Sequence, residues 1–105
     1  MSENIDISVV VPLYNEAESL PELMERIDRV AVANGLGYEG LMIDDGSTDA
    51  SWSVIEELGR RYSTLRALSF MHNYGKSAAL YVGFEMARGG VVITMDADLQ
   101  DSPEE

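Results

Sequence analysis

Short apolar runs alternate along the chain with longer stretches in which apolar residues recur every three or four positions. An unbroken run such as Val9-Val10-Val11 is typical of a strand that is buried on both faces of a sheet. The longer stretches have the spacing of one helix face. The predicted strands are Ile5 to Pro12, Tyr38 to Asp44, Leu65 to Phe70 and Val91 to Met95. The predicted helices lie between Ser19 and Asn34, between Asp49 and Tyr62, and from Gly75 to Ala87.

Strands that alternate with helical crossovers indicate an α/β fold, with a parallel sheet and helices on both faces. Right-handed crossovers then give a Rossmann-like sheet with a strand order of about 3-2-1-4. In such sheets ligands bind beyond the carboxyl ends of the strands, where the strand order reverses. We therefore expect a binding crevice between the first and fourth strands.

Local features refine the helix predictions. Ser19 and Glu22 have the spacing of a capping box, and Pro21 suits a first turn. Either Asp49 or Ser51 is expected to cap the second helix. The third helix is apolar on nearly all sides, so we expect it to be buried or to be left under-covered in this chain.

Polar clusters follow the first, second and fourth predicted strands. They are Tyr14-Asn15-Glu16, Asp44-Asp45-Gly46-Ser47 and Asp96-Ala97-Asp98-Leu99-Gln100. Because parallel strands end at one edge, five carboxylates are expected to converge there, and they repel one another unless a cation or water compensates. Mg²⁺ or Mn²⁺ suits such oxygen ligands, with Asp96 and Asp98 facing one ion and Gln100 adding an amide oxygen. Each cluster also has a simpler interpretation as a turn or a helix cap.

Three further residues are candidates for chemistry. Tyr14 either packs in the core or lies at the lip of the crevice, where it would pack against a planar base. Lys76, the only lysine, lies at a helix start and either binds an anion or is simply solvated. His72, the only histidine, is expected to be structural or exposed rather than a catalytic base.

Composition limits the remaining classes. The chain has 105 residues, a net charge of -12 and no cysteine. This length suits one domain, and the missing cysteines exclude disulfides and cysteine-based zinc sites. The acidic balance argues against nucleic-acid binding, which needs clustered cations. No apolar run approaches the roughly 20 residues of a membrane helix, so we expect a cytoplasmic protein.

The sequence resembles the family 2 glycosyltransferases of the GT-A fold, in particular their polyprenyl-phosphate branch. That branch contains dolichyl-phosphate mannose synthases and bacterial undecaprenyl-phosphate glycosyltransferases. The motifs that carry the resemblance are Val9-Val10-Val11-Pro12-Leu13-Tyr14-Asn15-Glu16, Ile43-Asp44-Asp45-Gly46-Ser47-Thr48-Asp49, Asn73-Tyr74-Gly75-Lys76 and Met95-Asp96-Ala97-Asp98-Leu99-Gln100-Asp101 with Pro103-Glu104. Ser102 departs from this pattern, because the branch often has proline there.

The resemblance implies a role for each matching position. Pro12, Tyr14 and Glu16 would line the nucleotide pocket. Ile43 and Asp45 would contact the base, with Asp45 accepting a hydrogen bond from a base N–H. Asp96, Asp98 and Gln100 would bind Mg²⁺ or Mn²⁺, so that Asp96 and Asp98 are the expected catalytic residues, with Ala97 beside the nucleotide.

The resemblance also implies what the intact enzyme does. Residues 1–105 correspond to the nucleotide-binding half of a longer GT-A domain. The donor is expected to be a UDP-sugar rather than a GDP-sugar, and the acceptor a polyprenyl phosphate, with inversion at the sugar. The remainder would carry the acceptor site and any membrane helices, and would hold the intact protein at the cytoplasmic face. The fragment alone is expected to be inactive and to self-associate through its fourth strand or third helix.

Three alternatives compete with this interpretation. A receiver domain is similar in length and acidity, but its acidic pair follows the first strand rather than the second. A Toprim-type nucleotidyl-transfer domain would use Glu16 with Asp96 and Asp98, yet it leaves Asp44 and Asp45 unexplained. A non-catalytic module that binds nucleotide or metal is the third alternative.

Overall fold

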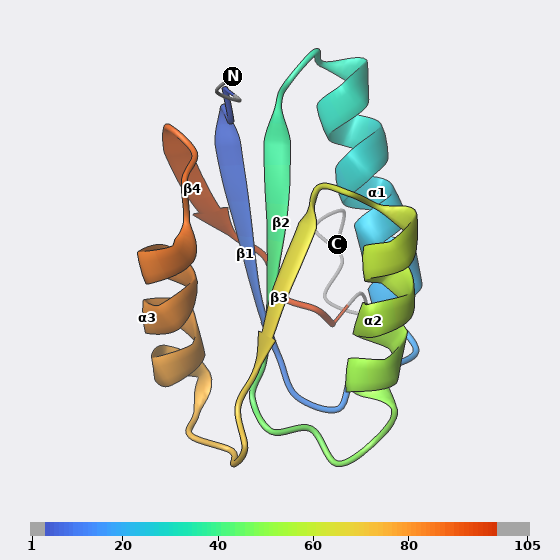
Figure 1. Ribbon diagram of the computed structural model, residues 1–105, viewed down its shortest axis with the longest axis vertical. Helices are drawn as coiled ribbons and strands as arrows, with labels where there is room; N and C mark the ends of the chain where they lie inside the picture. Colours follow the sequence, from blue (N-terminus) through green and yellow to red (C-terminus); the bar gives the residue numbers. More distant parts are fainter. Residues whose placement is uncertain (1–3, 99–105) are drawn as a thin grey trace, which may run out of the picture.

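A computed structural model describes residues 4–98 of the chain. Its four strands form one parallel sheet in the order β3-β2-β1-β4 (Figure 1). The elements are β1 (Ile7–Leu13), α1 (Leu20–Ala33), β2 (Tyr38–Asp44), α2 (Ser51–Arg61), β3 (Leu65–Ser69), α3 (Lys76–Met86) and β4 (Val91–Thr94). This architecture confirms the α/β class, the succession of elements and the strand order predicted from the sequence.

Helices α1 and α2 cover one face of the sheet, and α3 lies on the other face (Figure 1). The main core lies between the sheet and helices α1 and α2. Alternate residues of a strand point to the same face, so every second residue of β1 enters this core. It joins the sheet residues Val9, Val11 and Met42 to buried helix residues. Those helix residues are Leu20, Leu23, Met24, Ile27, Ala31, Ile55 and Leu58. The regular apolar spacing of α1 and α2 therefore reflects one continuous hydrophobic core.

The face under α3 is thinner. Only Ala79 and Gly83 of this helix are buried, and a Cβ on Gly83 would lie 2.4 Å from Val10 Cγ1. Glycine at position 83 thus lets the helix approach β1 closely. On its outer side Tyr81 is 65% and Phe84 is 51% exposed. This outer surface confirms the expectation that α3 is under-covered.

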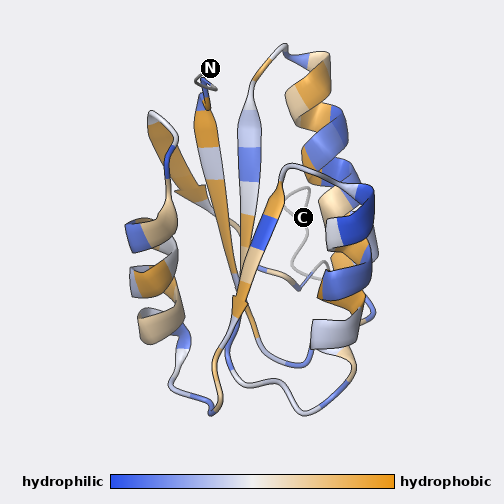
Figure 2. Ribbon diagram, in the orientation of Figure 1, coloured by the Kyte–Doolittle hydropathy of each residue, from blue (hydrophilic) through white to orange (hydrophobic). Residues whose placement is uncertain are grey.

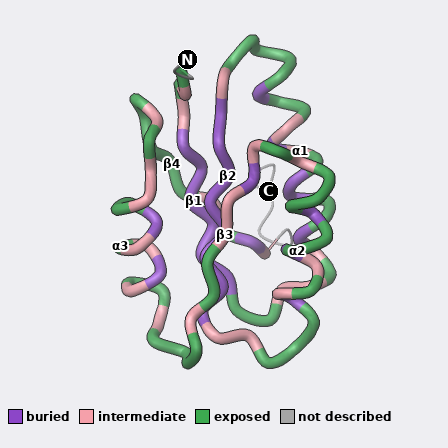
Figure 3. Tube along the Cα trace, viewed as in Figure 1, coloured by how far each residue is buried: buried purple, intermediate pink, exposed green. Residues whose placement is uncertain are grey.

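Strand β4 is an edge strand in the described part of the chain, because it pairs with β1 alone there. Its residues Val91, Val92 and Ile93 are exposed, as the tube in Figure 3 shows, and most of β4 is hydrophobic in Figure 2. An apolar groove of about 260 Å³ lies beside it, and its wall includes Val30 of α1 together with Ile93 and Met95. Self-association through this edge remains a prediction.

The predicted capping box at α1 is wrong. Ser19 occupies the N-cap position, but its backbone is already helical (φ −91°, ψ −14°) and its side chain makes no capping hydrogen bond. The hydroxyl therefore points away from the first-turn amides. At α2 the N-cap is Ala50, and Asp49 accepts a 2.8 Å hydrogen bond from the Ser51 amide instead.

A buried carboxylate links three strands at the end of the sheet where β2 begins. Glu39 is 2% exposed and accepts hydrogen bonds from the Ser8 hydroxyl (2.6 Å), the Arg66 guanidinium (2.8 Å) and the Arg88 amide (2.7 Å). Burial by itself raises the pKa of Glu39, but the hydrogen bonds from Ser8, Arg88 and Arg66 outweigh it, so the pKa is lowered. Because Arg66 also donates to the Met86 carbonyl, this cluster fixes the end of α3.

Candidate functional site

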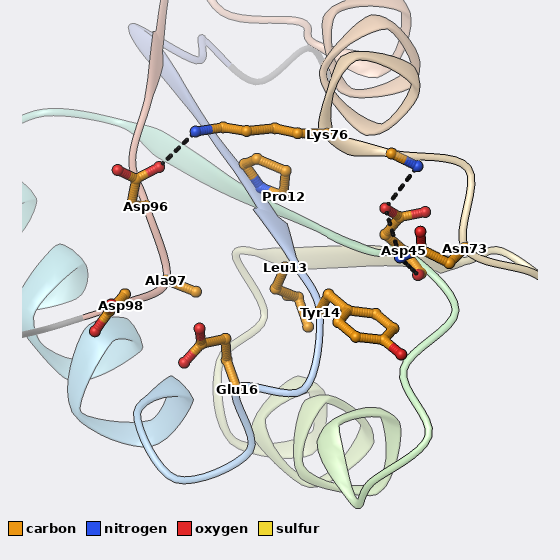
Figure 4. A pocket seen from close by; sticks show the side chains of 11 residues that line it. Pro12, Leu13, Tyr14, Glu16, Asp45, Asn73, Lys76, Asp96, Ala97 and Asp98 are labelled. Atoms are coloured by element: carbon orange, nitrogen blue, oxygen red, sulfur yellow. Dashed lines mark hydrogen bonds and ion pairs between the residues drawn. The ribbon is translucent and has the colours of Figure 1, made fainter.

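A cavity of about 440 Å³ lies at the carboxyl ends of β1 and β4 (Figure 4). Its position matches the crevice that the reversal of strand order predicts. The loops after β1 and β4 form part of its wall, and the loop before α3 closes the other side. The lining residues are Pro12, Leu13, Tyr14, Glu16, Asp45, Asn73, Gly75, Lys76, Asp96, Ala97 and Asp98.

The cavity brings together most of the predicted site residues. Pro12, Tyr14, Glu16, Asp45, Asp96, Ala97 and Asp98 all line it. Ile43 does not, because its side chain is fully buried in the sheet. Gln100 lies outside the described residues. Contact of Ile43 with a ligand base thus has no support in this geometry, while the roles of the lining residues stay predictions.

The expected convergence of five carboxylates is reduced to four. Asp44 is 1% exposed and is not part of the cavity wall, and its Oδ1 accepts a 2.9 Å hydrogen bond from the Ser47 amide. Asp44 is the last residue of β2, whereas Asp45 is the first residue of the following loop and is the one that lines the cavity. Asp44 thus shapes the turn, as the simpler interpretation of that cluster proposed.

Asn15 joins the loops that follow β1 and β2. Its backbone is left-handed (φ 55°), a conformation that asparagine tolerates better than most residues. Its Oδ1 accepts hydrogen bonds from the amides of Thr48 (2.8 Å) and Asp49 (3.2 Å), and its own amide donates to the Ser47 hydroxyl (2.8 Å). Asn15 therefore fixes the loop that presents Tyr14 and Glu16, a role that sequence reasoning missed.

Asp45 holds the loop before α3. It is 4% exposed, and its carboxylate accepts hydrogen bonds from the amides of Tyr74 (2.7 Å) and Gly75 (2.9 Å) and from Asn73 Nδ2 (3.2 Å). A carboxylate has about four acceptor positions, so acceptor capacity remains for one ligand N–H. Asp45 thus fixes the loop before α3 in this structure, a role that is additional to the hydrogen bond with a nucleotide base that the resemblance implies.

The loop after β4 is held at its centre. Ala97 is buried, and its carbonyl accepts a 2.7 Å hydrogen bond from the Ser19 hydroxyl at the start of α1. On either side of Ala97 the carboxylates of Asp96 and Asp98 line the cavity. The side chain of Lys76 reaches across from α3, and its Nζ lies 3.0 Å from Asp96 Oδ1 (Figure 4).

The donor set is suited to a shared metal site rather than a closed one. Within residues 4–98 no group of three or more His, Cys, Asp or Glu side chains could hold a metal ion. Asp96 and Asp98 nevertheless offer two hard oxygen donors at one wall, and Asp96 already accepts a cationic partner. Mg²⁺ is commonly held by one or two carboxylates together with phosphate oxygens and water. The residues present therefore fit a divalent cation whose remaining ligands would be phosphate oxygens and water.

Residues 8–105 match the family described as Glycosyl transferase family 2. This chain belongs to glycosyl transferase family 2. The match covers nearly the whole sequence and confirms the family expected from the four motifs. It also excludes the receiver and Toprim interpretations.

Among curated proteins the chain is similar to undecaprenyl-phosphate sugar transferases. It is 45% identical over 100 residues to the undecaprenyl-phosphate 4-deoxy-4-formamido-L-arabinose transferase of Pseudomonas aeruginosa (strain LESB58). The alignment covers 94% of this chain but only 30% of that enzyme. The likeness confirms the expected similarity to the polyprenyl-phosphate branch, and the chain spans about a third of the length of such relatives.

Solved glycosyltransferases share the fold. A mannosyltransferase from Pyrobaculum calidifontis, solved in complex with GDP-Man and Mn²⁺, aligns with 92% of this chain and 28% of its own, at 26% identity and a TM-score of 0.71. Residues 1–349 of TarS from S. aureus, in complex with UDP, align with 90% of this chain and 28% of their own, at 24% identity and a TM-score of 0.75.

In residues 4–98 no helix has the length and apolarity needed to cross a bilayer.

Proposed function

We propose that this chain binds the nucleoside diphosphate of a nucleotide sugar, as the donor-binding part of a glycosyltransferase. The observation that carries the proposal is the cavity at the carboxyl edge of the sheet. Its wall combines an aromatic ring, a hydrogen-bond acceptor and a pair of carboxylates, which belong to Tyr14, Asp45, Asp96 and Asp98. Family membership supplies the reaction class. The transferred sugar goes to a polyprenyl phosphate acceptor, as the names of the curated relatives suggest.

The nucleoside end of the donor lies between Tyr14 and Asp45 in this proposal. Tyr14 is 43% exposed at the lip of the cavity, where its ring can pack against a planar base. The remaining acceptor capacity of Asp45 suits a base N–H, such as N3–H of uracil or N1–H of guanine. A UDP-sugar is the donor that we favour, as the resemblance to the bacterial undecaprenyl-phosphate glycosyltransferases implies.

The diphosphate end lies against Asp96 and Asp98. A divalent cation bound there, Mg²⁺ or Mn²⁺, would neutralise the charge that develops on the diphosphate leaving group. The two carboxylates would orient that cation, and the Ser19 contact at Ala97 keeps their loop in place. Gln100 is the third proposed ligand.

The reaction is a direct displacement at the anomeric carbon with inversion. A phosphate oxygen of the acceptor forms the new bond, and the nucleoside diphosphate leaves with the bonding electrons. A phosphate nucleophile is already ionised at neutral pH, so it needs no strong general base. The position of His72 agrees with this, since it is exposed and does not line the cavity.

A thermal-shift panel with UDP, GDP and CDP, each with and without Mn²⁺, tests the proposal on this chain. We expect UDP to raise the melting temperature most, and Mn²⁺ to increase the shift. A larger shift with GDP would reassign the base. No shift with any nucleotide would contradict the proposed donor site.

A further inference from the structure

Lys76 is the only cationic residue in the wall of the described cavity. The other charged residues of that wall are Glu16, Asp45, Asp96 and Asp98, which are all acidic. The Lys76 ammonium lies 3.0 Å from Asp96 Oδ1, and the two side chains are 62% and 58% exposed. A cation therefore already stands at one of the two carboxylates that are proposed to hold the metal.

We infer that Lys76 and the divalent cation exchange places at Asp96, and that the displaced Lys76 then binds the diphosphate of the donor. The inference rests on the proposed function and adds to it a way in which metal binding and donor binding are coupled. Without ligands, Lys76 partly neutralises the acidic wall. With ligands, its charge moves to the anion that arrives with the metal.

Electrostatics favour this exchange. A divalent cation interacts about twice as strongly with Asp96 as a monovalent ammonium at the same distance, and it binds Asp98 as well. The ammonium and the metal repel each other, so both cannot stay at the same carboxylate oxygens. An ion pair this exposed is worth little, which makes its release easy.

The backbone around Lys76 lets only the side chain move. Asp45 holds the amides of Tyr74 and Gly75 directly before it, and Lys76 is the first residue of α3. The Cα of Lys76 is thus fixed at the cavity wall. Its four-carbon stem can rotate between Asp96 and the centre of the cavity, where the diphosphate is proposed to lie.

Two binding measurements on the chain test the inference with Lys76→Met. The first is a titration with Mn²⁺ alone, in which the electron paramagnetic resonance signal reports the free ion. The second is a calorimetric titration with UDP at saturating Mn²⁺, the condition in which Lys76 is displaced from Asp96. From the range for exposed ion pairs we expect affinity for Mn²⁺ to rise about two- to fivefold in Lys76→Met and affinity for UDP to fall by a similar factor.

Two control variants separate exchange from general charge and from folding. Arg60→Met also removes one positive charge, but Arg60 pairs with Glu57 on the surface of α2 and is not part of the cavity wall. It should change neither affinity. Lys76→Arg keeps the charge and should retain affinities close to those of the wild type.

The outcomes distinguish the inference from the function on which it rests. Opposite changes in the two affinities of Lys76→Met, absent in Arg60→Met, support the exchange. A loss of both affinities in Lys76→Met would show that Lys76 has a structural role. An unchanged Mn²⁺ affinity would show that Lys76 and the metal do not compete for Asp96. Either result overturns the inference but leaves the proposed donor site intact. Failure of the wild type to bind both Mn²⁺ and UDP would overturn the proposed function, and the inference with it.

Discussion

The hydroxyl of Ser19 donates a 2.7 Å hydrogen bond to the carbonyl oxygen of Ala97, 78 residues further along the chain. The same hydroxyl lies 3.2 Å from Glu16 Oε1. One hydroxyl at the start of α1 thus contacts both the loop after β1 and the loop after β4. Ser19 thereby sets the position of the backbone between Asp96 and Asp98.

Ser19→Ala should therefore weaken the metal-dependent part of UDP binding. Loss of one hydrogen bond that positions the loop corresponds to roughly 0.5–1.5 kcal/mol. UDP binding in EDTA should change less, because the base contacts do not involve this loop. Calorimetry with and without Mn²⁺ measures both quantities. Ser53→Ala on the exposed side of α2 is the matched control, and equal losses in the two conditions would contradict a positioning role.

Asp96→Ala and Asp98→Ala should each remove the effect of Mn²⁺ on nucleotide binding while the fold is retained. Asp96 is largely exposed, so its truncation leaves no buried group without a partner. Relief of repulsion among the wall carboxylates should keep the melting temperature of the ligand-free variants at or above that of the wild type. Circular dichroism and thermal shift check this. A variant that unfolds would show that the aspartate is structural.

Asp45→Asn should weaken UDP binding both with and without Mn²⁺. An asparagine has one acceptor oxygen in place of two, so it cannot hold the amides of Tyr74 and Gly75 and a base N–H together. The expected loss is roughly 1–3 kcal/mol of binding free energy. Glu56→Gln, an exposed carboxylate on α2, provides the control. Unchanged UDP affinity in Asp45→Asn would contradict both roles of this residue.

Glu39 should make the stability of the fold sensitive to acid. Its pKa in the folded state lies below the ordinary 4.5. The folded state therefore favours the ionised form, and this contribution is complete above about pH 4.5 and is lost as the pH falls through the folded-state pKa. Glu39→Gln should lower the free energy of unfolding at pH 7 by roughly 1–3 kcal/mol and flatten its decline below pH 4.5.

Urea unfolding between pH 3 and pH 7 measures this effect. Glu57→Gln is the control, because Glu57 is exposed and pairs only with its helix neighbour Arg60 among the contacts described. A decline as steep in Glu39→Gln as in the wild type would show that other carboxylates carry the acid sensitivity.

The periodicity of apolar residues predicts the strands and helices and their succession along the chain. The spacing of apolar residues in α1 indicates which face of this helix is buried. The continuous apolar run near the end of β2 indicates a strand that is buried on both faces. Right-handed crossovers then restrict the possible strand orders, and the order β3-β2-β1-β4 predicted among them is the one observed, with the three polar clusters at the carboxyl edge of the sheet. Most of the cavity wall follows from these local signals.

The contacts that hold the site in place lie beyond such signals. Ser19 has the sequence of a cap, but its partner Ala97 is far along the chain, and only the tertiary structure brings the two together. Asn15 is fixed by the loop after β2 in the same way. Glu39 lies in a predicted strand, and nothing local to it in the sequence indicates its partners. They come from β1, β3 and the segment that follows α3.

The central claim is that a nucleoside diphosphate binds at the carboxyl edge of the sheet. An amide-resolved NMR titration of the isotope-labelled chain with UDP in Mg²⁺ tests it most directly, because it reports binding and location together. The account predicts that the largest shifts fall on the amides of Leu13, Tyr14, Gly75 and Ala97, which line the cavity. Shifts confined to the apolar groove beside β4, or no shifts at saturating UDP, would contradict it.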